Sequence, residues 1–172
     1  VAGVDLMAFW RDAAFDDAAF ASHVTLAVMA LGAESEGPLL LTLGGLGDWL
    51  AAHGFDYDSD DARQASRNLF LSARQAAEAF DLDVRLGLVS DPELALRLGA
   101  RLDSAPWNGP VTVAETADGE LVRVLSEAGR MALAAVDADL ATAQAALLGH
   151  RSLADAPGVN VQSLVARGFT AL

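Results

Sequence analysis

Four aspartates lie close together around residue 58 and could bind a cation. Asp56, Asp58 and Asp60 have the spacing of the first, third and fifth ligands of an EF-hand calcium loop. That loop also needs a glycine at its sixth position and a bidentate glutamate at its twelfth, where this chain has Asp61 and Arg67. The pattern therefore favours the start of a helix, where negative charge complements the helix dipole, over a calcium site.

Gly44, Gly45 and Gly47 form a second group of interest, because glycine-rich turns bind phosphate. They lack the G-x-G-x-x-G order of a dinucleotide site and the Lys-Ser/Thr pair of a P-loop. No convincing strand is expected before them, and apolar residues flank them on both sides. We therefore expect these glycines to lie against another helix, since a missing Cβ lets two backbones approach closely.

Groups that commonly carry catalysis are scarce. The chain has no cysteine, which excludes disulfides, thiolate nucleophiles and cysteine-based metal sites, and it has no lysine for Schiff-base chemistry. His23, His53 and His150 are scattered singly, so we interpret each of them as structural. We predict no catalytic, cofactor-binding or metal-binding residue, and an enzyme is disfavoured.

The tryptophans are interpreted as packing residues. Trp10 and Trp49 are expected in the core or at an interface. Trp107 stands in the loop 104–110, which is rich in proline and glycine. It is the tryptophan that we expect to be exposed or to cap a pocket.

The composition narrows the classes of function. With a net charge of −13 and a pI of about 4.3, the chain repels nucleic acid and anionic lipid. Hydrophobic residues make up 53%, which is enough for a sizeable core, and no apolar run approaches the ~20 residues that cross a bilayer. The N-terminus shows no basic segment followed by an apolar stretch, so we expect a cytoplasmic protein without nucleic-acid or membrane partners.

Three helical patterns occupy the N-terminal part of the chain. Asp16 is a suitable N-cap for a first helix, whose apolar residues recur at helical spacing. A second helix is predicted over Leu39–His53. Asp58 or Ser59 caps a third helix that ends near Phe80. Because the second and third helices are joined by a short turn, we expect them to pack antiparallel.

The remaining sequence has weaker patterns. Residues 82–88 alternate apolar and polar as in a half-buried strand, and residues 111–116 are a second strand candidate. Asp91 caps a short helix between them. The longest helical pattern covers residues 120–148, and Asn160 caps a last short helix. Four glycines are predicted to end helices: Gly32, Gly54, Gly149 and Gly168.

These patterns predict a mainly α protein, an irregular bundle of four to six helices with a small two-stranded β element near residues 82–116. An all-helical chain with extended linkers is the alternative for that region. We expect a single domain over residues 1–172. It would consist of a helical part (1–81), a mixed or irregular connection (82–117) and C-terminal helices (118–172).

Three segments resemble the large subunit of ribonucleotide reductases, especially the adenosylcobalamin-dependent class. Val4–Phe9 and the following Phe15–Phe20 are similar to the stretch after the family's catalytic loop. Leu43–Arg63 resembles the helix pair that comes next, and Ser163–Thr170 resembles a short motif further downstream. The family's chemistry needs a radical cysteine, a redox pair of cysteines and a loop with Asn, Cys and Glu, so no catalytic residue is transferred to this chain.

The resemblance and the composition together predict a non-catalytic, ribonucleotide-reductase-like protein. It would act through self-association or by binding a reductase-type protein. The alternative is an unrelated helical domain that binds a small ligand or serves as an adaptor, with a helix pair that matches by convergence. No cofactor is expected in either case. A closed apolar pocket with convergent polar groups would favour the alternative.

Overall fold

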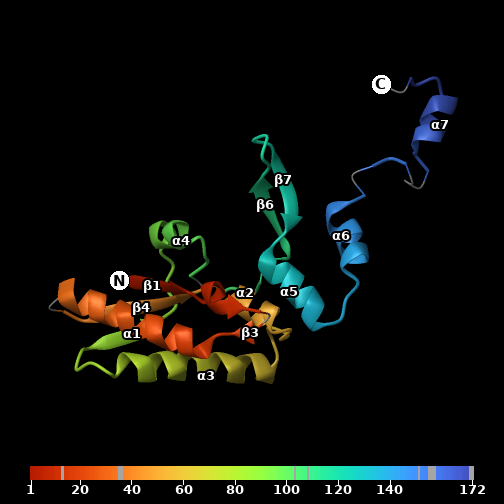
Figure 1. The fold of residues 1–172 in the computed structure, drawn as a ribbon. Helices are drawn as coiled ribbons and strands as arrows, with labels where there is room; N and C mark the ends of the chain where they lie inside the picture. Colours follow the sequence, from red (N-terminus) through yellow and green to blue (C-terminus); the bar gives the residue numbers. More distant parts are fainter. Residues whose placement is uncertain are drawn as a thin grey trace.

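The computed structural model describes residues 1–12, 14–34, 37–102, 104–107, 109–150, 152–154 and 158–170. These residues form an α/β fold with a three-stranded parallel sheet and seven α-helices (Figure 1). The prediction of a mainly α bundle of four to six helices is therefore wrong. The leucine-rich central strand has a high helix propensity by itself, and its pairing with two neighbouring strands overrides that preference.

Three short strands make the parallel sheet. They are, in spatial order, β1 (Ala2–Asp5), β4 (Leu39–Gly44) and β5 (Val84–Gly87). β1 pairs with β4 in the register that places Val4 beside Leu43. Almost every residue of β4 is buried, because a central parallel strand is covered on both faces.

Two long helices cover one face of the sheet and connect its strands. α1 (Asp17–Glu34) leads from β1 to β4, and α3 (Asp60–Ala77) leads from β4 to β5. The two helices pack against each other beneath the sheet (Figure 1). Phe20, Val24 and Leu43 are fully buried in the resulting core, which accounts for most of the apolar burial in the fold.

The short helix α4 (Pro92–Leu98) covers the other face of the sheet (Figure 1). A Cβ added to Gly3 would lie 2.4 Å from the Leu98 Cδ1 atom, so this close approach needs glycine. Thr42 is the register partner of Gly3 on β4 and therefore faces the same side of the sheet. Its hydroxyl is fully buried and has no hydrogen-bond partner among the described residues.

The segment Leu39–His53 is not the single helix that was predicted. β4 occupies its first part, a turn follows at Gly45, and α2 (Leu46–Ala52) forms the second part. The predicted antiparallel helix pair is consequently wrong as well, and α3 packs on α1 instead. A continuous apolar run of this length is compatible with either a buried strand or a helix, and only the tertiary pairing decides.

The long helix predicted over residues 120–148 is also absent from the described residues. β7 (Leu121–Leu125), α5 (Glu127–Ala135) and α6 (Leu140–Leu148) replace it. β7 pairs with β6 (Val111–Glu115) as an antiparallel hairpin. The strands predicted at 82–88 and 111–116 are thus confirmed, but they do not pair with each other, since β5 completes the parallel sheet.

Most predicted helix ends are confirmed. The Asp16 carboxylate accepts a hydrogen bond from the Ala19 amide at 2.8 Å, and the Ser59 hydroxyl accepts one from the Ala62 amide at 3.0 Å. Capping side chains are local to the sequence and independent of the fold class, which is why they were predictable. The other confirmed end residues are Asp91, Asn160, Gly54, Gly149 and Gly168. The prediction that Gly32 ends the first helix is wrong, because α1 continues to Glu34 and a single glycine is tolerated inside a helix.

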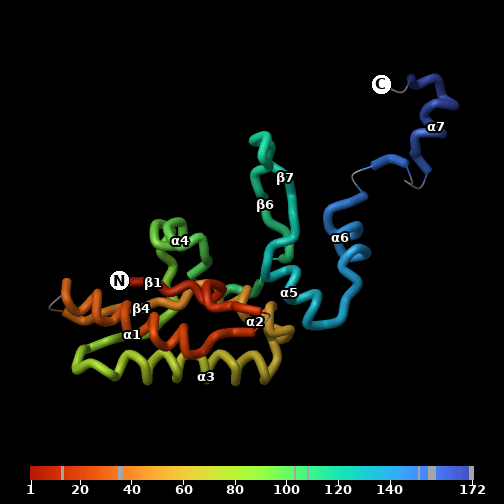
Figure 2. The backbone as a smooth tube through the Cα atoms, in the orientation of Figure 1, coloured from red at the N-terminus to blue at the C-terminus, as the bar shows by residue number. Residues whose placement is uncertain are grey.

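The remaining elements lie at the two ends of the chain. Near the N-terminus, the 3₁₀ helix η1 (Leu6–Phe9) leads into a small hairpin of β2 (Trp10–Arg11) and β3 (Ala14–Phe15). At the C-terminus, α7 (Val161–Ala166) follows α6 away from the sheet (Figure 2). None of the helices in the described part of the chain is both long and apolar enough to cross a membrane.

Burial divides the chain into two regions, which we call the body (residues 1–135) and the arm (residues 136–170). The body contains the sheet, its covering helices and α5, and all the buried residues of the described chain belong to it. The arm contains α6 and α7, and none of its described residues is buried. The arm extends away from the body in Figures 1 and 2.

Candidate functional site

The carboxyl ends of the parallel strands are the first candidate site, because open α/β sheets bind ligands there. Asp5 ends β1 and Gly44 ends β4, and the turn after β4 leads directly into α2. A strand therefore precedes the glycines, contrary to the sequence prediction. Gly45 adopts a left-handed conformation with φ of 74°, and a Cβ there would lie 3.0 Å from the Asp5 Oδ1 atom.

Asp5 is the titratable group at this edge whose environment is most unusual. Its Oδ1 atom accepts a hydrogen bond from the Met7 amide at 3.1 Å and so caps η1. Burial raises the pKa of the Asp5 carboxyl above 3.8, the Met7 amide lowers it, and the negative charge of Asp48 raises it further. This residue was not predictable from the sequence, because one aspartate after a short apolar run carries no distinctive pattern.

The chain itself closes this edge of the sheet. The Gly45 amide donates a hydrogen bond to the Arg101 carbonyl at 2.6 Å, and Gly47 faces the backbone of Trp107. Tyr57 donates a hydrogen bond to the Ser104 carbonyl and holds the same loop from the other side. The cavity left beside the glycine turn is only about 10 Å³, which is room for one water molecule at most.

The glycines were correctly expected to permit close backbone approach, but the approaching segment is not a helix. It is the loop 100–107, whose Ala100 and Leu102 side chains lie within 3.4 Å of a Cβ built on Gly44. This loop covers the turn, and its Arg101 carbonyl accepts the hydrogen bond from the Gly45 amide. The turn therefore cannot bind a phosphate in this conformation.

The aspartate cluster acts as a helix start, as its sequence suggested. Ser59 caps α3, and Asp60 and Asp61 lie in its first turn. Arg63 contacts the carboxylates of Asp58 and Asp60 at 3.2 Å and 2.9 Å. In the part of the chain that the structure describes, no group of three metal-ligating side chains is placed to hold a metal ion.

The three histidines lie in separate places. His23 and His53 each use Nδ1 in a hydrogen bond to a carbonyl of the preceding helical turn, at 3.0 Å and 2.9 Å. His53 also packs among aromatic rings, with Trp49 at 4.2 Å and Trp10 at 4.6 Å between ring centroids. His150 lies near the end of α6. The structure thus does not bring the histidines together.

A second candidate site is an apolar groove between α2 and α5, with a volume of about 390 Å³. We call it the α2–α5 groove. Its lining is almost entirely apolar, with the carboxylate of Asp56 at the rim. Trp107 forms part of its wall, which agrees with the expectation that this residue caps a pocket, and the indole N–H has no partner among the described residues. The other lining residues are Ala51, Gly54, Phe55, Pro110, Gly129, Ala132, Leu133 and Val136.

Two glycines allow the walls of the α2–α5 groove to approach each other. A Cβ on Gly54 would lie 2.9 Å from the Ala135 Cβ atom, and a Cβ on Gly129 would lie 2.7 Å from the Pro110 carbonyl oxygen. The groove was not predictable from the sequence, because its residues come from three distant segments. A glycine inside a helical pattern, as at Gly129, was the available signal for such close packing.

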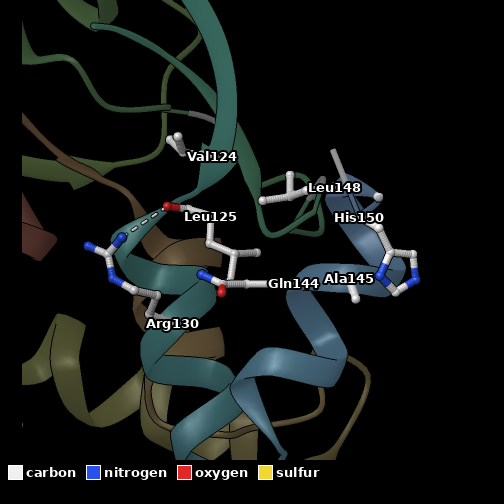
Figure 3. A pocket seen from close by; sticks show the side chains of 8 residues that line it. Val124, Leu125, Arg130, Gln144, Ala145, Leu148 and His150 are labelled. Carbon is white, nitrogen blue, oxygen red and sulfur yellow. Dashed lines mark hydrogen bonds between the residues drawn. The ribbon is translucent and has the colours of Figure 1, made fainter. Parts of the chain in front are cut away.

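A larger cavity of about 570 Å³ separates α6 from the body (Figure 3). Leu125 and Arg130 line it from the body, and Gln144, Leu148 and His150 line it from the arm (Figure 3). Arg130 donates a hydrogen bond from Nη1 to the Leu125 carbonyl at 3.1 Å, so its guanidinium links the start of α5 to the end of β7. The cavity shows that α6 is only loosely packed against the body.

Comparison with known proteins adds no relative. A scan against models of protein families finds no match, and a search of curated proteins finds none either. The fold and its cavities therefore define the chain as an α/β protein with a closed sheet edge and an open apolar groove. The resemblance to ribonucleotide reductases stays a prediction.

Proposed function

We propose that this chain is a non-catalytic protein that acts by self-association through its arm. The observation that carries the proposal is that the arm's apolar side chains have no core to enter. Its helices α6 and α7 contain no buried residue. The large apolar residues exposed there are Val136, Leu140, Leu147, Leu153, Val159, Val161, Val165 and Phe169.

The total surface supports this proposal. The chain exposes 11040 Å². A compact monomer of 17.8 kDa exposes about 8,000 Å². The excess of about 3,000 Å² exceeds the roughly 800 Å² that each partner contributes to a standard interface. The chain therefore has more than enough exposed surface for such an interface.

The distribution of charge also favours contact through the arm. Residues 1–135 contain 21 acidic side chains and nine arginines, whereas residues 136–172 contain three and two. Two bodies would repel each other, but the arm is nearly neutral and loses little hydration when it is buried. Self-association through the arm should therefore strengthen at high salt, which screens the repulsion between bodies.

Light scattering on the full chain tests the proposal. At micromolar concentrations and moderate salt we expect a mass of twice 17.8 kDa. Leu140→Ser combined with Leu147→Ser should shift the chain toward monomer. Leu96→Ser should not, although Leu96 is 84% exposed, because it lies on α4 in the body. A chain that stays monomeric at millimolar concentration would refute self-association.

A reductase-type protein is the alternative partner, because the segments within residues 4–80 resemble that family. Affinity purification of the tagged chain from its source cell would test this version. Recovery of a reductase subunit that depends on Leu140 and Leu147, from a chain that is monomeric alone, would favour it over self-association.

A second candidate function is the binding of a small apolar molecule. The α2–α5 groove favours it, since its volume and apolar lining lie within the range of ligand pockets. Quenching of tryptophan fluorescence by a panel of apolar ligands would test it, with Trp107→Phe as the control for a signal from the groove. Saturable quenching that the variant abolishes would favour a ligand.

A further inference from the structure

We propose that α7 of one copy of the chain docks in the α2–α5 groove of a second copy, and that the exchange is reciprocal. This inference rests on the proposed self-association and names its contact surfaces. The groove is an open apolar surface, and α7 is an apolar helix of which no residue is buried. A reciprocal exchange gives a closed dimer with a twofold axis, the commonest form of homo-oligomer.

The ends of α7 are well defined, although none of its residues is buried. Asn160 and Ser163 form a reciprocal capping box, with hydrogen bonds of 2.9 Å and 3.0 Å between side chain and backbone. Gly168 adopts φ of 90° at the other end, and the Phe169 amide donates to the Leu164 carbonyl at 3.1 Å. A six-residue helix is not stable alone in water, so its stability must come from packing against another surface.

One side of α7 can supply that packing. Val161, Leu164 and Val165 are three and four residues apart and therefore lie on the same side of the helix. Phe169 follows directly after the helix and is 62% exposed. An aromatic and three aliphatic side chains match a groove whose walls include Phe55 and Leu133.

The charges at the two surfaces are complementary. Arg167 ends α7 and forms no ion pair with the described residues. Asp56 lies at the rim of the groove and likewise has no cationic partner among them. The neighbouring Asp58 and Asp60 already contact Arg63, which leaves Asp56 as the acceptor for an incoming arginine. Such a pair would set the direction in which α7 enters.

The path of the chain favours docking of α7 in the groove of a second copy over docking in the groove of its own copy. After α5, the chain runs through α6 and continues away from the α2–α5 groove to α7 (Figure 1). α6 contacts α5 and β7 of its own copy, although loosely. The exposed surface in excess of a compact monomer is also several times the roughly 800 Å² that a standard dimer requires from each partner.

Cross-linking between single-cysteine variants tests the inference, because the natural chain has no cysteine to interfere. Val136→Cys places a thiol at the groove, and Val165→Cys places one on α7; these positions are 62% and 53% exposed. Differently tagged chains would be mixed and treated with a short bismaleimide. We expect a cross-linked heterodimer, and little product when Leu96→Cys on α4 replaces the α7 variant.

The location of the cross-link distinguishes the occupants of the groove. In a chain that carries both cysteines, a product confined to one chain at every concentration would place α7 in its own groove and overturn the inference. If light scattering shows a dimer but no cross-link forms between the groove thiol and the α7 thiol, this contact is refuted while self-association stands. A monomer under all conditions refutes both.

A substitution in α7 provides a second measurement. Phe169→Ser should raise the dimer Kd by about tenfold or more, as expected when an aromatic anchor is lost from an interface. Because Phe169 is 62% exposed in the single copy, the far-ultraviolet circular dichroism of the variant should be unchanged. An unchanged Kd would overturn the inference. A groove that takes a small ligand instead would give that unchanged Kd together with ligand-dependent quenching of Trp107.

Discussion

The body and the arm place their apolar side chains differently. In the body, Phe20, Val24 and Leu43 are fully buried between the sheet and two crossover helices. In the arm, Val165 and Phe169 are more than half exposed on segments that have good caps but no core. The same types of residue thus stabilise one region of a single copy, while in the other they remain free to contact another molecule.

This difference implies that the core of the body determines stability, whereas the arm and the α2–α5 groove determine association. The site with the highest prior expectation in an α/β protein, the carboxyl edge of the sheet, is closed by the chain's own loop 100–107. The α2–α5 groove and the arm, by contrast, are open to another molecule. We therefore expect substitutions in the body to change the free energy of unfolding and substitutions in the arm to change association.

The largest expected effect is in the core of the body. Phe20→Ala should lower the free energy of unfolding by about 3–5 kcal/mol, because it opens a cavity beneath the sheet. Phe169→Ala, measured on dilute monomer, should change it by less than about 0.5 kcal/mol. Urea denaturation of both variants measures the two changes in the free energy of unfolding. Similar losses would remove the distinction between body and arm.

A smaller effect of opposite sign is expected at Thr42. Its buried hydroxyl has no partner among the described residues, so Thr42→Val should raise the free energy of unfolding by about 1 kcal/mol. Thr25→Val is the matched control, because the Thr25 hydroxyl donates to the Ala21 carbonyl at 3.0 Å and should be costly to remove. A loss of stability in both variants would show that the Thr42 hydroxyl is bonded.

A still smaller effect is expected for the ion pair between copies. Asp56→Arg alone or Arg167→Asp alone should weaken the dimer by about two- to fivefold, the range of exposed ion pairs. The double variant should regain the parental Kd at the same salt concentration. Sedimentation equilibrium of the four chains measures this. Additive losses in the double variant would contradict the pairing.

The smallest effect concerns the pH dependence of the body. Burial raises the pKa of Asp5 above 3.8, so the folded chain holds this proton more tightly than the unfolded chain does. The resulting stabilisation is present at acid pH and is lost as the pH rises from 3.8 through the raised pKa. Asn in its place can still cap η1 without a charge.

Asp5→Asn should therefore gain stability relative to the parent as the pH rises above 3.8 toward neutrality. Urea titrations across this pH range would detect the change in the difference between the two proteins. A difference that is independent of pH would show that Asp5 has the same pKa in the folded and unfolded chains. Association through the arm should be unaffected by this substitution.

Local features of the fold, such as helix caps, were predictable, whereas the pairing of its strands was not. Asp16, Ser59 and Asn160 cap helices through bonds to residues three positions away, and such contacts follow from sequence alone. β4 and β7 were predicted as helix because leucine and valine at helical spacing are ambiguous. Their strand character comes from partners that are distant in the sequence for β4 and just across a turn for β7.

The candidate site was predictable only in part. The loop around Trp107 indicated a residue at a pocket, and that residue does line the α2–α5 groove. The opposite wall, formed by α5, was not predictable. The sequence pattern places α5 inside one long helix over residues 120–148, and such a helix would not position Leu133 beside Trp107. The exposed arm was likewise hidden, since an amphipathic pattern shows which side chains favour burial but not which surface buries them.

Hydrogen–deuterium exchange measured at several protein concentrations tests the central claim most directly. Amides of β4 should be protected equally at all concentrations, because the body folds within one copy. Amides of α7 should exchange freely in dilute samples and become protected as the dimer forms. Free exchange of α7 at concentrations where the chain is dimeric, or protection in the dilute monomer, would contradict an arm that packs against a second copy.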